Sequence, residues 1–123
     1  MLNIALNAVF LDEQSLPEDN IYLWAYHMKI TNQYDQAIVL KKRYFEVVDS
    51  KAQIHVVEGI GLWDSEVSIK QNEVIEYVSG ILLNHPSGVF AGFFVIEDSQ
   101  GRLFQEVIPS FSLDSKYEIC PLQ

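Results

Sequence analysis

The sequence predicts a single all-β domain, an immunoglobulin-like sandwich of seven or eight antiparallel strands. Apolar residues recur at every second position in several segments, and clusters of turn residues separate these segments at intervals of about 8–12 residues. No segment has convincing helical spacing. Short strands with regularly spaced turns are typical of a sandwich or a barrel.

The clearest alternation lies in residues 21–30. One face of this segment, which we expect to be buried, carries Tyr22, Trp24, Tyr26, Met28 and Ile30. The opposite face carries Ala25, His27 and Lys29. Aromatic residues favour extended structure, so this pattern predicts a long strand with one buried side.

The other predicted strands span residues 4–11, 37–48, 53–58, 74–81, 89–96 and 103–108. Residues 37–48 form either one bent strand or two short ones. Polar or glycine-containing turns are predicted at residues 32–36, 49–51, 84–88 and 98–101. In the last of these we expect Gly101 to supply a left-handed conformation. Residues 64–72 are the best helical candidate, but their spacing is poor.

The length of 123 residues corresponds to one domain, which we assign to residues 1–123 with a core at about 4–113 and a tail at 114–123. We expect the tail to be loose or packed along an edge. The chain has 17 acidic and 8 basic residues and a net charge of −9. Because nucleic-acid binding requires Lys and Arg to neutralise phosphates, no nucleic-acid partner is expected. An acidic surface suits a basic partner or cations.

Cys120 is the only cysteine, so no internal disulfide can form, and a lone cysteine is typical of reducing compartments. The N-terminus lacks the basic region of a signal peptide. No apolar run approaches the ~20 residues that a membrane helix needs. We therefore expect a cytoplasmic protein with no membrane association.

No catalytic set is recognisable in the sequence. The serines lie outside any Gly-x-Ser-x-Gly elbow. His27, His55 and His85 are far apart and have no ligand-type neighbours at metal-binding spacing. Acidic pairs such as Glu97-Asp98 lack the spacing of a calcium loop. The sequence therefore predicts no catalytic residues, no metal site and no cofactor, and the protein is not expected to be an enzyme.

One loop is a candidate binding site. It comprises Gly59, Ile60, Gly61, Leu62, Trp63 and Asp64. The loop begins like a GxGxxG phosphate loop, but Asp64 occupies the third glycine position. A carboxylate about 4 Å from a phosphate costs on the order of 4 kcal/mol at an effective dielectric near 20. A charge-assisted hydrogen bond returns only roughly 1.5–3 kcal/mol.

Two interpretations of this loop therefore remain open. In the first, the glycines permit a bulge or a sharp bend and have a structural role. In the second, the loop holds a cation or a cation–polyphosphate complex, where a metal would reverse the effect of Asp64. Leu62 and Trp63 either pack inward or face a partner, since Trp is common at binding hot spots.

Several stretches together resemble a known family. They are Tyr22-Leu23-Trp24-Ala25-Tyr26, Ile30-Thr31-Asn32, Val39-Leu40, Arg43-Tyr44-Phe45, Glu58-Gly59-Ile60-Gly61, Tyr77-Val78-Ser79-Gly80, Pro86-Ser87-Gly88-Val89-Phe90-Ala91-Gly92 and Ile108-Pro109-Ser110-Phe111-Ser112-Leu113. In this order they resemble the ApaG family over roughly residues 4–113. The chain departs from the family pattern at Phe45, at Asp64 and at Gln71-Asn72, where the family has Trp, Gly and Pro-Gly.

The resemblance implies a fibronectin type III-like sandwich and a protein-interaction module. It also implies a family-level association with cobalt and magnesium homeostasis. We therefore predict a non-enzymatic binding module with a protein partner that the sequence does not identify. A homodimer formed through an unpaired strand edge is a further expectation.

Overall fold

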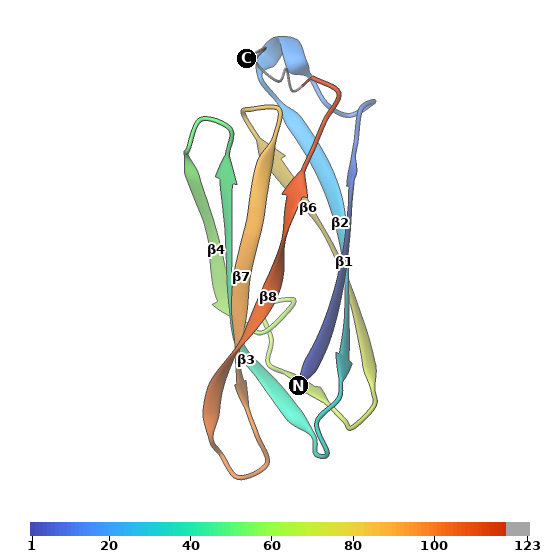
Figure 1. Ribbon diagram of the computed structural model, residues 1–123, viewed down its shortest axis with the longest axis vertical. Coiled ribbons are helices and arrows are strands. Elements are labelled where there is room, and N and C mark those ends of the chain that lie inside the picture. Colours follow the sequence, from blue (N-terminus) through green and yellow to red (C-terminus); the bar gives the residue numbers. More distant parts are fainter. Residues whose placement is uncertain (118–123) are drawn as a thin grey trace.

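The computed structural model describes residues 1–117, in which eight strands form two antiparallel sheets that pack face to face (Figure 1). The strands are β1 (Leu2–Phe10), β2 (Tyr22–Asn32), β3 (Ile38–Asp49), β4 (Ile54–Ile60), β5 (Val67–Ile69), β6 (Val74–Leu83), β7 (Gly88–Glu97) and β8 (Leu103–Leu113). The predicted all-β sandwich is confirmed. The only helix in this range is a short 3-10 helix, η1 (Pro17–Asp19), and no helix there is long and apolar enough to cross a membrane.

Each predicted strand is present, and β3 is one strand with a register shift between Leu40 and Lys42. Gly101 has a φ of 80°, which confirms the left-handed position in the turn between β7 and β8. The strand β5 was not predicted, because three residues are too few to show a period of two. The buried Asn32 amide holds this region in place, donating hydrogen bonds of 2.9 Å to the carbonyl oxygens of Gln36 and Ile69.

The first sheet has the order β1-β2-β6 and the second the order β4-β3-β7-β8. β3 pairs with β7 along one side, so β5 and β4 share its other side. At one lateral edge of the sandwich, β1 and β8 lie together, and the Leu2 N–H donates to Oε1 of Glu106 at 2.6 Å. At the other edge, β4 and β6 each pair with a single strand within residues 1–117. We call this side the open edge.

The core lies between the sheets and is rich in aromatic rings. All five β2 residues predicted to be buried are at most 8% exposed. Phe90 of β7 connects the layers, because its ring lies 5.4 Å from that of Tyr26 in the first sheet and 5.2 Å from that of Phe45 in the second. Offset or tilted aromatic pairs at these distances stabilise a core beyond simple area burial.

The described start of the tail packs on the domain. The Trp24 indole donates to the carbonyl oxygen of Asp114 at 2.9 Å, and the Tyr117 ring contacts Phe10 and Tyr22. Lys116 forms an ion pair of 2.7 Å with Asp12. Residues 114–117 therefore cover one end of the first sheet. Cys120 lies outside the described residues.

Candidate functional site

The loop that follows β4 is a tight two-residue hairpin at Trp63 and Asp64. The Leu62 N–H donates to the Ser65 carbonyl at 3.1 Å, and the Ser65 N–H donates back to the Leu62 carbonyl at 2.9 Å. Trp63 and Asp64 have φ values of 53° and 55°, as in a type I′ turn. A left-handed tryptophan costs about 1–3 kcal/mol, so the surroundings hold Trp63 in a strained conformation.

Gly61 makes this hairpin sterically feasible. Its φ is 47°, and a Cβ atom there would overlap the carbonyl group of Ser65. Only glycine fits this position without movement of the backbone. This geometry favours the structural interpretation of the glycines, in which they permit a sharp bend.

Arg43 of β3 fastens the loop to the second sheet. Its Nη1 donates to the carbonyl oxygens of Ile60 at 3.0 Å and Gly61 at 3.3 Å, and its Nη2 donates to Oδ1 of Asp64 at 3.0 Å. The guanidinium passes so close to Gly59 that a Cβ there would lie 3.1 Å from Nη2. The side chain is 10% exposed, and its buried Nε has no hydrogen-bond partner within the described chain.

These contacts determine what the loop offers to a ligand. The N–H groups of Gly61, Leu62 and Ser65 already donate to backbone carbonyls, and β5 follows the loop where a phosphate loop would open a helix. The Asp64 carboxylate is 85% exposed and is paired with Arg43. The cation–polyphosphate interpretation stays a prediction that no contact within residues 1–117 favours.

The two large residues of the loop have opposite positions. Leu62 is fully buried and belongs to the core. Trp63 is 57% exposed, and its ring meets Tyr77 edge-on at 5.4 Å. The sequence left open whether these residues pack inward or face a partner. In the structure Leu62 packs inward, and Trp63 lies on the surface.

Tyr77 also lines an apolar cleft between the two sheets at the open edge. The cleft has a volume of about 160 Å³. Its walls include the inward-facing side chains of His55 and Val57 from β4 and of Tyr77 and Ile81 from β6, and the Phe45 ring lies deeper. Two edge strands and a tryptophan therefore surround one hydrophobic opening. Sequence reasoning identified Trp63 but not the cleft.

A few polar residues, including Tyr26 and His55, also line this cleft. Burial, and next the neighbouring Tyr77, raise the pKa of Tyr26, so its hydroxyl stays neutral and can donate a hydrogen bond. His55 Nε2 lies 3.2 Å from Oδ2 of the buried Asp49, and His85 Nε2 lies 4.0 Å from the same oxygen. An apolar cavity with a few polar groups is the usual form of a binding site.

The buried Asp49 is held in its charged form. Burial raises its pKa, but hydrogen bonds from the Gln53 N–H, His55 and the Lys51 N–H, together with the charge of His85, outweigh burial and lower the pKa overall. The sequence did not indicate that two of the three histidines meet at one carboxylate. Within the described chain, no three His, Cys, Asp or Glu side chains form a group that could hold a metal ion.

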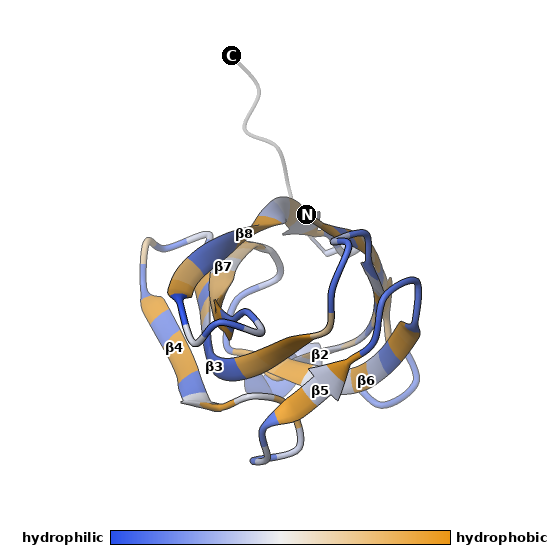
Figure 2. Ribbon diagram, turned by 90° about the horizontal axis from the view of Figure 1, so that it is seen from below, coloured by the Kyte–Doolittle hydropathy of each residue, from blue (hydrophilic) through white to orange (hydrophobic). Residues whose placement is uncertain are grey.

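The edge strands also expose apolar side chains to solvent. Hydrophobic and hydrophilic residues alternate along β4 and β6 (Figure 2). Seven large ones are 43–65% exposed: Ile54, Val56, Val57, Ile60, Val74, Val78 and Leu82. We call the outer edges of β4 and β6, the cleft and Trp63 together the open-edge surface. Unpaired strands with apolar side chains attract further strands, so natural proteins usually protect them.

Comparison with known proteins relates the chain to a defined group. A family model described as the ApaG domain matches residues 12–98. The chain is 35% identical over 116 residues to Protein ApaG of Parvibaculum lavamentivorans, covering 94% of this chain and 89% of that protein. It is 36% identical over 114 residues to Protein ApaG of Rhizobium etli, covering 93% and 88%. The crystal structure of a putative ApaA protein from Bordetella pertussis aligns with a TM-score of 0.90 at 25% identity over 96% of each chain.

Proposed function

The chain belongs to the ApaG domain family, and on this premise we propose that it is a non-enzymatic binding module whose open-edge surface holds an extended segment of another protein. The family membership confirms the resemblance predicted from the sequence. The observation that carries the proposal is the apolar cleft between two edge strands that each have one unpaired side within residues 1–117. An extended segment can add to such an edge through main-chain hydrogen bonds, and pockets for its side chains then give specificity.

The size of the cleft supports a side chain as its occupant. A cavity of about 150 Å³ lined by apolar residues can hold benzene. The 160 Å³ cleft therefore suits one aromatic or branched aliphatic side chain. Sites for drug-sized or larger small molecules have volumes of about 300–1,000 Å³. This comparison favours a protein segment with one apolar anchor over a nucleotide.

Trp63 and the overall charge support the same proposal. Trp63 is held in a strained conformation with its ring largely exposed beside the cleft, and backbone strain of this kind is found at functional sites. The net charge of −9 attracts a basic segment and speeds its encounter with the surface. We accordingly expect basic residues beside the apolar anchor of the partner.

The cellular setting rests on the family and the composition alone. We place the module in divalent-cation homeostasis only through the ApaG resemblance. A cytoplasmic location is supported by the single cysteine. A second copy pairing through β4 is the competing occupant of the edge, and sedimentation over a range of protein concentrations distinguishes the two.

Selection from a display library of random linear peptides tests the proposal. We expect peptides with one large apolar residue and flanking basic residues to be enriched. Their binding should be lost in Val57→Asp, which places a charge in the cleft wall, and weakened in Trp63→Ala. Val9→Asp on β1 is the matched control, because Val9 and Val57 are both 53% exposed. Equal binding by Val57→Asp and Val9→Asp, or a concentration-dependent dimer through β4, would refute the proposal.

A further inference from the structure

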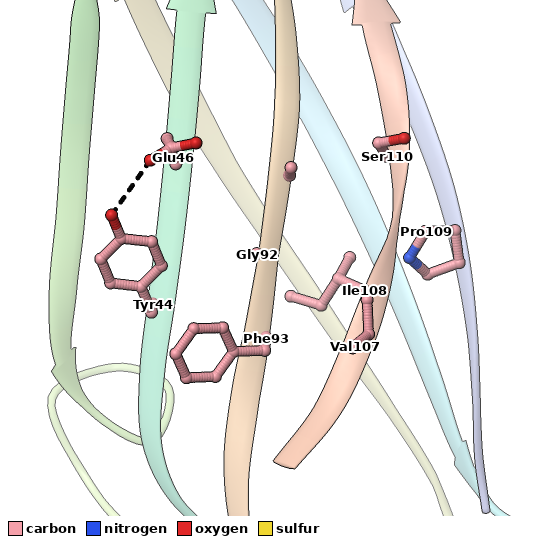
Figure 3. A pocket seen from close by; sticks show the side chains of 9 residues that line it. Tyr44, Glu46, Gly92, Phe93, Val107, Ile108, Pro109 and Ser110 are labelled. Atoms are coloured by element: carbon pink, nitrogen blue, oxygen red, sulfur yellow. Dashed lines mark hydrogen bonds between the residues drawn. The ribbon is translucent and has the colours of Figure 1, made fainter.

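The outer face of the second sheet carries a second concave surface, whose lining side chains are drawn in Figure 3. It shares no lining residue with the cleft between the sheets. This hollow has a volume of about 440 Å³ and is open to solvent on the far side of β3, β7 and β8 from the core. Tyr44, Glu46, Phe93, Val107 and Pro109 line it. The proposed function does not use any of these side chains.

A small side chain and an irregularity in strand pairing give the hollow its concave form. Ala91 of β7 leaves room at its floor, and the pairing of β7 with β8 shifts register between Phe90 and Gly92, beside Pro109. Val107 is 74% exposed on one side. Such an irregularity redirects side chains and opens the surface of a sheet.

Two aromatic rings form one wall. The rings of Tyr44 and Phe93 are stacked, with centroids 5.2 Å apart and an angle of 17° between their planes. Both side chains are half-buried, so their positions are restricted by neighbours. The faces of aromatic rings attract cations, and a guanidinium can also stack flat on them.

Carboxylates lie directly beside these rings. The Tyr44 hydroxyl donates to Oε1 of Glu46 at 3.1 Å, as Figure 3 shows. This hydrogen bond, then burial, then the charges of Glu46 and Glu58 raise the pKa of Tyr44, so both carboxylates act on the same hydroxyl. Among the ion pairs of residues 1–117, none includes Glu46 or Glu58. Glu46 is thus a half-buried carboxylate that has a hydroxyl donor beside the aromatic pair but no cationic partner among residues 1–117.

We infer that this hollow binds an arginine side chain of a basic protein partner, with the guanidinium stacked on Tyr44 and Phe93 and hydrogen-bonded to Glu46. Arginine fits better than lysine because its planar fork can stack on a ring and bond a carboxylate at the same time. Val107 and Pro109 supply apolar contact for the methylene chain of the arginine.

Charge complementarity selects this occupant over a second copy of the chain. Two copies packed face to face would bring Glu46 and Glu58 of one close to Glu46 and Glu58 of the other, and each copy has a net charge of −9. Like charges brought together in this way suppress association. A basic segment, in contrast, meets both carboxylates with opposite charge.

Amide NMR spectra of the isotope-labelled protein, titrated with the blocked tripeptide Ac-Gly-Arg-Gly-NH2, test the inference. We expect shifts centred on Tyr44, Glu46 and Phe93. The citrulline analogue of the tripeptide, which keeps the shape without the charge, should bind at least about tenfold more weakly, and the lysine analogue should be intermediate. Equal shifts with arginine and citrulline would overturn the inference.

Variants distinguish binding in the hollow from nonspecific attraction of arginine to the acidic surface. Glu46→Gln should weaken arginine binding about tenfold, whereas Glu18→Gln within η1 should leave it unchanged. Tyr44→Phe keeps the ring and frees Glu46 from its hydroxyl partner, so binding should be retained or strengthened. Equal loss in Glu46→Gln and Glu18→Gln, or a dimer that Val107→Asp dissociates, would show that the hollow has no such role. An amide spectrum of each variant that matches the wild-type spectrum outside the hollow serves as the folding control.

Discussion

Replacing Arg43 by glutamine removes the guanidinium that fastens the Gly59–Asp64 loop to β3. Two of its hydrogen bonds go to the carbonyl oxygens of Ile60 and Gly61, at 3.0 and 3.3 Å. Hydrogen bonds to a charged group contribute roughly 1.5–3 kcal/mol each, and the surface position of the loop favours the lower end, or about 3 kcal/mol together. Removing the buried and unpartnered Nε returns about 1 kcal/mol of this. The expected net loss in the free energy of unfolding is about 2 kcal/mol.

Urea unfolding followed by Trp fluorescence measures this loss. With a slope of about 1–3 kcal/mol per molar urea, the Arg43→Gln midpoint should fall by roughly 0.7–2 M. Arg43→Lys should lie between the wild type and Arg43→Gln, since lysine keeps the charge but loses the planar fork.

Asp64→Asn is the matched control for Arg43→Gln. Asparagine also tolerates a positive φ, and the Asp64 carboxylate is 85% exposed, so the loss should stay below about 1 kcal/mol. A larger loss for Asp64→Asn than for Arg43→Gln would show that the exposed ion pair, and not the carbonyl contacts, holds the loop. A loss below about 0.5 kcal/mol for Arg43→Gln would refute the reasoning altogether.

Three further predictions concern the fold around the site. Gly92→Ala should destabilise the protein by more than about 2 kcal/mol in urea unfolding, because a Cβ atom there overlaps the Tyr44 carbonyl. Gly80→Ala is the control, since its Cβ atom makes only ordinary van der Waals contact and should change stability by less than about 1 kcal/mol. Leu62→Ala should cost about 2–5 kcal/mol, while Trp63→Ala should cost less than about 1 kcal/mol and act on binding instead. Folding lowers the pKa of Asp49, so its ionised form stabilises the fold above about pH 4, and this contribution is lost as the pH falls through the lowered value. Asp49→Asn should therefore be less stable than the wild type near neutral pH. Its melting temperature should also fall less steeply as the pH is lowered into the acid range.

Each of these predictions has a contrary result. Equal effects of Gly92→Ala and Gly80→Ala would mean that β3 and β7 can separate without cost. A loss for Trp63→Ala as large as that for Leu62→Ala would place the Trp63 ring in the core. If the melting temperature of Asp49→Asn falls as steeply in acid as that of the wild type, other carboxylates cause the loss of stability. Asp98 is one such group, because hydrogen bonds from Arg102 also lower its pKa.

Local pattern accounts for much of the fold. The alternation in β2 predicts which five side chains face the core, since a period of two fixes the direction of every side chain once one face is buried. The turn at Gly101 is predictable for a similar reason, because few residues other than glycine adopt its conformation without strain. In both cases the information lies within a few neighbouring residues.

The features that sequence reasoning missed depend on contacts between distant residues. Arg43 reaches a loop partner 21 positions away, and no spacing rule connects the two. The cleft depends on which strands stand at the edges of the two sheets, and strand order is not encoded in the period of any single strand. Trp63 was identified because a large aromatic residue in a glycine-containing loop is notable by itself. Its contact with Tyr77 of β6, in contrast, depends on which strands lie side by side.

Amide hydrogen exchange in the presence of a selected peptide tests the central claim about the open-edge surface most directly. The account predicts that the peptide slows exchange at outward-facing amides of β4 or β6 and leaves β1 and β8 unchanged. In the Val57→Asp variant the same peptide concentration should give no added protection. Added protection confined to β1 and β8, or equal protection in the wild type and Val57→Asp, would contradict the claim that the protein binds its partner between β4 and β6.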